Sequence, residues 1–252
     1  MLFVCSPMDI GDYAASNIGD VSVFTNADEV AFYKNGTFVS KLSVDNFTAL
    51  PHPPMVLDDM IGDMLETQEG FEKPKAELIK KSLLAAAKYG LAGMPKTEML
   101  RMGYAMMRYK MAYEDGVALY GKYVGNWGSA ATVWRFDAIK DGEVVASVTC
   151  CPNTALQLEV KPSKTQLCEG ATYDMAAVRI RILDGNGNIA PYAQLPVRLT
   201  LEGAAQLVGP DVVTAEGGMC GTYIRTTGEA GVAKLTVSAH GLEPVTVEFA
   251  VE

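Results

Sequence analysis

The chain has 252 residues, of which 49% are hydrophobic and 20% charged, and it carries a net charge of −9. An acidic chain repels a phosphate backbone on average, so nucleic acid is not an expected partner. No apolar run approaches the ~20 residues that span a bilayer, so a membrane-spanning protein is not expected either. The length allows one large domain or two ordinary ones.

The first predicted elements are three short β-strands between Val21 and Val39. Apolar and polar residues alternate there, and Asn35-Gly36 separates the last two strands. This dipeptide is a strong hairpin signal because both residues of the turn must accept a positive φ. The strand-like pattern extends from Met1 to about Leu50.

A helical pattern replaces the strands over residues 55–124. A short helix is expected from Met55 to Glu66. A second helix is expected over Lys75–Tyr89, because Pro74 suits its first position and Gly90 supplies a C-terminal stop.

Pro95 opens a third predicted helix, whose apolar residues recur in steps of three and four and so form one stripe. The stripe consists of Met99, Met102, Met106, Tyr109 and Tyr113. Nine of the thirteen methionines fall between Met55 and Met111. Methionine is flexible and suits adaptable contacts. The helices therefore form either a Met-rich core or a surface that docks on another domain or subunit.

Strands return after residue 130. A hairpin about Asp141-Gly142 is expected from Ala131–Ala138 and Glu143–Cys150. Seven more strands are expected at 155–161, 177–183, 195–201, 206–208, 220–226, 232–239 and 245–251. Short alternating strands at this spacing are typical of an immunoglobulin-like sandwich.

The predicted fold class is therefore mainly β, with two immunoglobulin-like β-sandwich domains. The first domain covers residues 1–158 and carries the helices as an insertion at about 55–124. The second domain covers residues 159–252. Pro162 interrupts the strand pattern near this boundary.

Acidic residues gather around the first predicted helix, but they lack the glycine-bearing loop of a calcium site, so a solvated helix face is expected. They are Asp58, Asp59, Asp63, Glu66, Glu69 and Glu72. The stretch 184–188 resembles part of a calcium loop, but Leu195 stands where the closing glutamate should be, so a hairpin turn is expected. We expect no metal site and no cofactor.

The chain's thiols and imidazoles show no zinc-binding spacing. They are Cys5, Cys150, Cys151, Cys168, Cys220, His52 and His240. The two histidines are expected in loops. Scattered thiols favour a reducing compartment. The sequence from Met1 enters a strand pattern without a signal peptide, and this absence carries no weight when the true N-terminus has been removed. A cytoplasmic location is therefore expected, with the protein's true N-terminus missing from this sequence.

Four aromatic residues are candidates for stacking on a sugar ring, because an aromatic face complements the C–H face of a pyranose. They are Trp127, Trp134, Tyr120 and Tyr123. Trp127 lies in a glycine-flanked loop where exposure is plausible. The competing interpretation for all four is packing in a core or an interface.

Three stretches, in this order and spacing, resemble the C-terminal region of glycoside hydrolase family 2, in its bacterial β-galactosidase-like members. Val23–Gly36 is similar to the family's strand, Asn, strand, Asn-Gly pattern in the domain after the catalytic barrel. Trp134–Val148 resembles the closing strands of that domain. Asp174–Asn188, followed by Leu207-Val208-Gly209, resembles the terminal sandwich. The resemblance covers nearly the whole chain, although the helical insertion is typical of only a subset of these enzymes.

The family's chemistry depends on two glutamates of a (β/α)₈ barrel, an acid/base and a nucleophile. This chain lacks the Asn-Glu dipeptide that carries the family's acid/base, and it shows no repeated strand–helix units. No catalytic residue is therefore assigned. The resemblance implies an accessory region that is inactive alone, that supports the catalytic domain missing from this chain, and that contributes to contacts in a possible homo-oligomer. The alternatives are a carbohydrate-binding module centred on Trp127 and a surface protein with tandem immunoglobulin-like domains.

Overall fold

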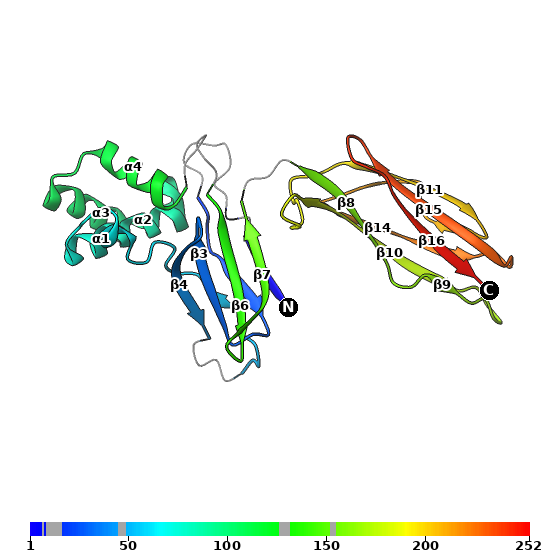
Figure 1. The fold of residues 1–252 in the computed structure, drawn as a ribbon. Helices are drawn as coiled ribbons and strands as arrows, with labels where there is room; N and C mark the ends of the chain where they lie inside the picture. Colours follow the sequence, from blue (N-terminus) through cyan, green and yellow to red (C-terminus); the bar gives the residue numbers. More distant parts are fainter. Residues whose placement is uncertain (7, 9–16, 45–48, 126–131, 152–154) are drawn as a thin grey trace. The chain divides into compact units, whose positions relative to one another are not determined.

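The computed structural model describes residues 1–6, 8, 17–44, 49–125, 132–151 and 155–252. The chain divides into two compact units, Met1–Pro152 (unit 1) and Asn153–Glu252 (unit 2), which are drawn in Figure 1. The predicted boundary after residue 158 lies inside β8 (Leu156–Pro162). Because β8 pairs along its whole length with β10 (Met175–Asp184), all of β8 belongs to unit 2.

Unit 1 contains two antiparallel sheets. The first has the order β4 (Thr37–Ser43), β3 (Glu29–Lys34), β6 (Trp134–Lys140) and β7 (Glu143–Cys150). The second has the order β1 (Leu2–Val4), β2 (Ser22–Thr25) and β5 (Met55–Val56). Strands far apart in sequence thus become neighbours, because β3 pairs with β6 across the helical segment.

Both predicted hairpins of unit 1 are confirmed. Asn35 and Gly36 have φ angles of 48° and 80°, and they connect β3 to β4. Asp141 and Gly142 have φ angles of 53° and 82°, and they connect β6 to β7. Two successive positive φ angles match the right-handed twist of the flanking strands.

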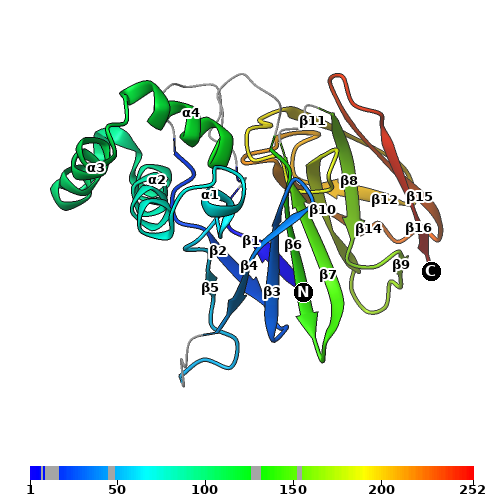
Figure 2. The same cartoon turned by 60° about the vertical axis from the view of Figure 1, so that its left-hand side comes forward.

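The helices of unit 1 lie together beside its sheets, as Figure 2 shows. They are α1 (Met64–Thr67), α2 (Lys73–Gly93), α3 (Lys96–Tyr109) and α4 (Tyr113–Tyr123). Gly90 leaves the helical conformation inside α2, with φ 65° and ψ 167°, at the position predicted to stop this helix. The final residues of α2 form a separate turn beyond this kink.

Two helix predictions are wrong. The segment from Met55 does not begin a helix, because Met55 pairs with Val23 in a sheet and the helical conformation begins only at Met64. The third helix does not reach Tyr113, because Lys110 adopts a left-handed conformation with φ 50° and ends α3. Tyr113 therefore starts α4, and it is not part of the methionine stripe.

The methionines of unit 1 divide between a core and a surface. Met55, Met60 and Met64 are at most 5% exposed and join the main core of the unit. By contrast, Met99 and Met107 of α3 are 54% and 74% exposed. The core interpretation is therefore confirmed for Met55, Met60 and Met64, and docking through the exposed methionines of α3 stays a prediction.

Unit 2 consists of two sheets around one core. The first sheet has the order β12 (Ala205–Val208), β14 (Met219–Thr226), β10 and β8. The second has the order β13 (Val212–Thr214), β11 (Pro196–Gly203), β15 (Gly231–Ala239), β16 (Val245–Val251) and β9 (Gln166–Leu167). The predicted alternation of β10 is confirmed, since Val178, Ile180 and Ile182 are at most 1% exposed and Arg179 faces solvent.

The chain is thus mainly β, as predicted. The immunoglobulin-like description of unit 2 stays a prediction, and one observation supports it. The order β8-β10-β14-β12 corresponds to the A-B-E-D sheet of an immunoglobulin sandwich, and β11-β15-β16 corresponds to its C-F-G sheet.

Candidate functional site

Two of the four aromatic candidates lie in the core of unit 1. Trp134 at the start of β6 and Tyr123 at the end of α4 are each 1% exposed. The ring of Trp134 stacks on Phe32 at a centroid distance of 5.4 Å. Because a sugar cannot reach a buried ring face, these two residues pack the core and offer no stacking platform.

The other two aromatic candidates have different outcomes. Tyr120 of α4 is half-buried, and burial raises the pKa of its hydroxyl. Its partial exposure leaves sugar stacking at this position a prediction. Trp127 lies outside the described residues, so its role also stays a prediction.

A buried lysine stands beside the aromatic core and was not anticipated from the sequence. Lys34 is 5% exposed, and its Nζ lies 5.0 Å from the ring centroid of Trp134 and 5.5 Å from that of Tyr123. The same Nζ donates a hydrogen bond of 2.7 Å to the backbone oxygen of Lys122. Burial, helped by the charge of Lys122, lowers the pKa of Lys34 to about 7.

Tyr123, Glu69 and Lys122 form a hydrogen-bonded trio. The hydroxyl of Tyr123 donates to Glu69 Oε1 at 2.6 Å, and Lys122 Nζ donates to the same oxygen at 2.5 Å. These hydrogen bonds, that of Lys122 first, lower the pKa of Glu69. The trio ties the segment between α1 and α2 to the last turn of α4.

The acidic cluster of the sequence is only in part a solvated face. Asp59 accepts hydrogen bonds from the backbone N–H groups of Ile61 and Gly62, and it pairs with Lys80 at 2.7 Å. Glu69 belongs to the trio described above. The other four carboxylates, which are exposed as predicted, are Asp58, Asp63, Glu66 and Glu72.

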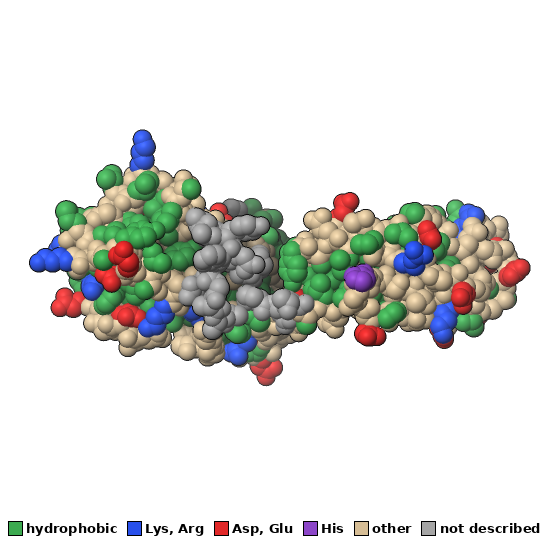
Figure 3. Space-filling model, turned by 90° about the horizontal axis from the view of Figure 1, so that it is seen from above, with side chains coloured by type: hydrophobic (Ala, Val, Ile, Leu, Met, Phe, Trp, Pro, Cys, Tyr) green, Lys and Arg blue, Asp and Glu red, His purple; other side chains and the backbone are tan. Residues whose placement is uncertain are grey.

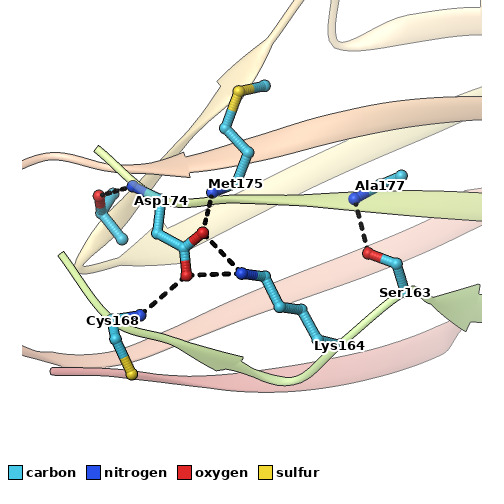
Figure 4. A network of polar contacts seen from close by, with 7 residues as sticks. Ser163, Lys164, Cys168, Asp174, Met175 and Ala177 are labelled. Carbon is cyan, nitrogen blue, oxygen red and sulfur yellow. Dashed lines mark hydrogen bonds and ion pairs between the residues drawn. The ribbon is translucent and has the colours of Figure 1, made fainter. Parts of the chain in front are cut away.

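Asp174 of unit 2 is a carboxylate with several hydrogen-bond partners, shown in Figure 4. Both of its oxygens accept from Lys164 Nζ at 2.6 Å, and the backbone N–H groups of Cys168 and Met175 also donate to it. These bonds, that of Lys164 first, lower its pKa to about 2. Its own N–H donates to Thr226 Oγ1 at 3.0 Å, so Asp174 links three segments of the sandwich.

No metal centre is found in the part of the chain that the structure describes. No group of three or more His, Cys, Asp or Glu side chains there could hold a metal ion. Asp184 accepts from the N–H groups of Asn186 and Asn188, which makes the predicted turn. His52 and His240 are exposed in a bend and a turn, as predicted. No helix among the described residues is long and apolar enough to cross a membrane.

These features define a class of protein before any comparison. The described carboxylates with ordered partners accept hydrogen bonds from backbone N–H groups and from lysine, arginine or tyrosine side chains, and the aromatic candidates that can be placed are wholly or partly buried. The class that they define is a mainly β protein of two compact units.

Comparison with known proteins identifies the family. Residues 158–248 match the family model described as glycoside hydrolase family 2 C-terminal domain 5. A β-galactosidase of Rhizobium radiobacter is 33% identical over 119 residues, which cover 46% of this chain and 82% of that protein. The chain belongs to glycoside hydrolase family 2, and it is a C-terminal accessory region of such a protein.

Other relatives are much longer than this chain. A β-galactosidase of Rhizobium meliloti is 25% identical over 213 residues, which cover 82% of this chain but 20% of that protein. A β-glycosidase of Bacteroides vulgatus matches with a TM-score of 0.58 and 13% identity, over 100% of this chain and 24% of that one. The structural match shows a shared fold. The chain thus spans about a fifth to a quarter of these two proteins.

Proposed function

We propose that this chain is the non-catalytic C-terminal part of a β-galactosidase-like enzyme, and that it stabilises the catalytic part of the same polypeptide. One observation carries the proposal. Most of the chain aligns with only a fifth of a β-galactosidase, and unit 2 matches the family's C-terminal domain. The remaining four fifths of such an enzyme has ample length for a catalytic barrel, which takes about 250 residues.

The pairing of Glu69 and of Asp174 with lysines agrees with this role. Glu69 and Asp174 have lowered pKa values because lysines and backbone or tyrosine donors hold them. A catalytic acid needs the opposite shift, towards neutral pH. We assign hydrolysis of a β-galactoside to the parent enzyme, because this chain contains no Asn-Glu dipeptide and unit 2 matches a C-terminal domain of the family.

The direct test removes this region from the full-length enzyme. We expect the truncated enzyme to have a lower Tm and a shorter half-life at 37 °C than the full-length enzyme. Its kcat/KM on a nitrophenyl β-galactoside should fall in proportion to the fraction of protein that is no longer folded. Unchanged Tm, half-life and kcat/KM after truncation would contradict a supporting role.

Three finer assignments belong to the same proposal. A homo-oligomer of the parent enzyme is tested by sedimentation of the full-length protein. A cytoplasmic location, supported by the thiols of Cys5, Cys168 and Cys220, is tested by cell fractionation. Carbohydrate binding by Trp127 or Tyr120 is tested on a glycan array, and it has less support because Trp134 and Tyr123 are buried.

A further inference from the structure

One face of α3 carries exposed apolar side chains at the spacing found in amphipathic helices that bind an apolar groove. Leu100, Tyr104 and Met107 are 74%, 53% and 74% exposed. They stand at positions i, i+4 and i+7, which lie on one side of a helix. Figure 3 shows hydrophobic side chains gathered over the helical part of unit 1. We call Leu100, Tyr104 and Met107 the α3 face.

The α3 face is not needed to hold α3 in unit 1. Ala105 is the buried residue of this helix, and Met102 and Met106 are half-buried. The helix lies against α2, at the outer edge of the helical part (Figure 2). Large apolar side chains gathered on one exposed face usually mark an interaction site. Anchors at i, i+4 and i+7 are how an amphipathic helix binds an apolar groove.

The charges around the α3 face determine which charge its binding partner must carry. Residues 96–110 contain four cations and one glutamate, and that glutamate, Glu98, is bonded to Arg101. The wider segment 73–110 contains nine cations and two glutamates, a net charge of +7, in a chain of net charge −9. A groove that receives this helix needs a rim of carboxylates, since like charges across an interface oppose binding.

We propose that the α3 face docks into an apolar groove with a carboxylate rim on the catalytic part of the same glycoside hydrolase polypeptide. This proposal rests on the proposed function above and names the surface through which it acts. It also explains why α3 keeps Leu100, Tyr104 and Met107 exposed on one side.

Two physical arguments favour this occupant over a second copy of the chain. A symmetric pair of α3 helices would place a net charge of +3 against another +3, which disfavours it. An interface between separate proteins also buries about 20 residues a side, and the α3 face has three anchors. A groove on the same polypeptide needs less area, because the covalent link supplies an effective concentration in the mM range.

Zero-length cross-linking of the full-length enzyme tests the partner. A carbodiimide joins a lysine amine to a carboxylate only where the two already touch. We expect Lys96 or Lys110 to be linked to aspartates or glutamates upstream of residue 1. Links only to carboxylates of this chain would overturn the proposal. The same reaction should be run on a mixture of isotope-labelled and unlabelled full-length enzyme. Cross-links from Lys96 or Lys110 that join a labelled copy to an unlabelled one would also overturn the proposal, because they would show that the α3 face binds a second copy.

Oxidation of Met107 by dilute peroxide tests the burial of the face in the same protein. We expect Met107 to react at least about ten-fold more slowly than an added methionine peptide, since a tenfold protection corresponds to about 1.4 kcal/mol. Leu100→Asp should remove most of this protection, whereas Val232→Asp, at an exposed position of unit 2, should leave it intact. A Met107 that reacts as fast as the peptide would overturn the proposal.

The two proposals can fail separately. If truncation lowers the Tm but Met107 reacts freely and Lys96 and Lys110 form no upstream links, the supporting role stands and the α3 face is not its contact. If the upstream links form but truncation changes nothing, the contact exists without a stabilising role. Binding of the full-length enzyme to anionic lipid vesicles, abolished by Leu100→Asp, would instead assign the face to a membrane surface and overturn the docking proposal.

Discussion

Lys34 Nζ donates a hydrogen bond of 2.7 Å to the backbone oxygen of Lys122, which joins β3 to the last turn of α4. The donor is a buried lysine, and its pKa is lowered to about 7. The helical segment is therefore fixed to the sheet by a group whose charge changes close to neutral pH.

Replacing Lys34 with methionine should change how stability depends on pH. The folded pKa of about 7 lies below the ordinary lysine value of 10.5, so between these values the unfolded chain binds the proton and the folded chain does not. The free energy of unfolding of the wild type should therefore rise relative to that of Lys34→Met between pH 7 and 10, by at most about 1.4 kcal/mol per pH unit. Below pH 6 the difference should be constant.

Urea unfolding of both proteins at pH 6, 7.5 and 9 measures this difference, because all other ionisable groups are shared. Parallel stability curves across this range would show that Lys34 keeps an ordinary pKa when folded. Lys140→Gln provides a control for removing a cation from the neighbouring strand, since Lys140 is exposed at the end of β6.

Replacing Asp174 with asparagine should weaken unit 2 and remove part of its acid sensitivity. The pKa of Asp174 is lowered to about 2 by Lys164 and two backbone donors, so its contribution to stability is fully present above the ordinary aspartate value of 3.8. That contribution is lost as the pH falls through 2. Melting curves of wild type and Asp174→Asn between pH 2 and 7 should differ most at pH 7 and converge near pH 2. A constant difference in Tm would contradict this assignment.

Replacing Gly203 with alanine should destabilise unit 2 far more than the same change at Gly241. Gly203 has φ +94°, and an added Cβ would lie 2.0 Å from the backbone oxygen of Val232. We expect a loss of about 3 kcal/mol or more, since the backbone must shift to relieve this contact. Gly241 has φ +76° and open space around it, so Gly241→Ala should lose only about 1–2 kcal/mol of left-handed strain. Similar losses in urea unfolding would contradict the clash.

Replacing Trp134 with alanine should destabilise unit 1 without a separate effect on sugar binding. Trp134 is 1% exposed and stacked on Phe32, so we expect a loss of about 3–5 kcal/mol. Val145→Ala, at a position 54% exposed, should stay within about 0.5 kcal/mol of the wild type. A Trp134→Ala protein that keeps its urea midpoint but loses glycan binding would restore the stacking hypothesis.

The strands were predictable because their signals are local. Asn35-Gly36 and Asp141-Gly142 require backbone conformations that few other residues accept, and the alternation of β10 identifies its buried face directly. The long-range pairing of β3 with β6 was not visible in either strand, because nothing local records which distant segment completes a sheet.

The errors have physical causes in single residues. Lys110 ends α3 by adopting a left-handed conformation that a lysine rarely takes, so the apolar spacing alone suggested a longer helix. Met55 lies in β5 and not in a helix, because it pairs with Val23 of β2, and the sequence around Met55 does not reveal this distant partner. Lys34 shares its side of β3 with Val30 and Phe32, and this period of two was the one signal that could have placed it inside.

The measurement that tests the central claim most directly is an assay of the isolated 252-residue chain beside the full-length enzyme. Hydrolysis of a nitrophenyl β-galactoside should be measured for both at equal concentration, after circular dichroism has confirmed that the isolated chain is folded. We expect turnover by the full-length enzyme and no turnover above buffer by the folded chain. Sustained turnover by the isolated chain, undiminished after repeated purification, would contradict an accessory role.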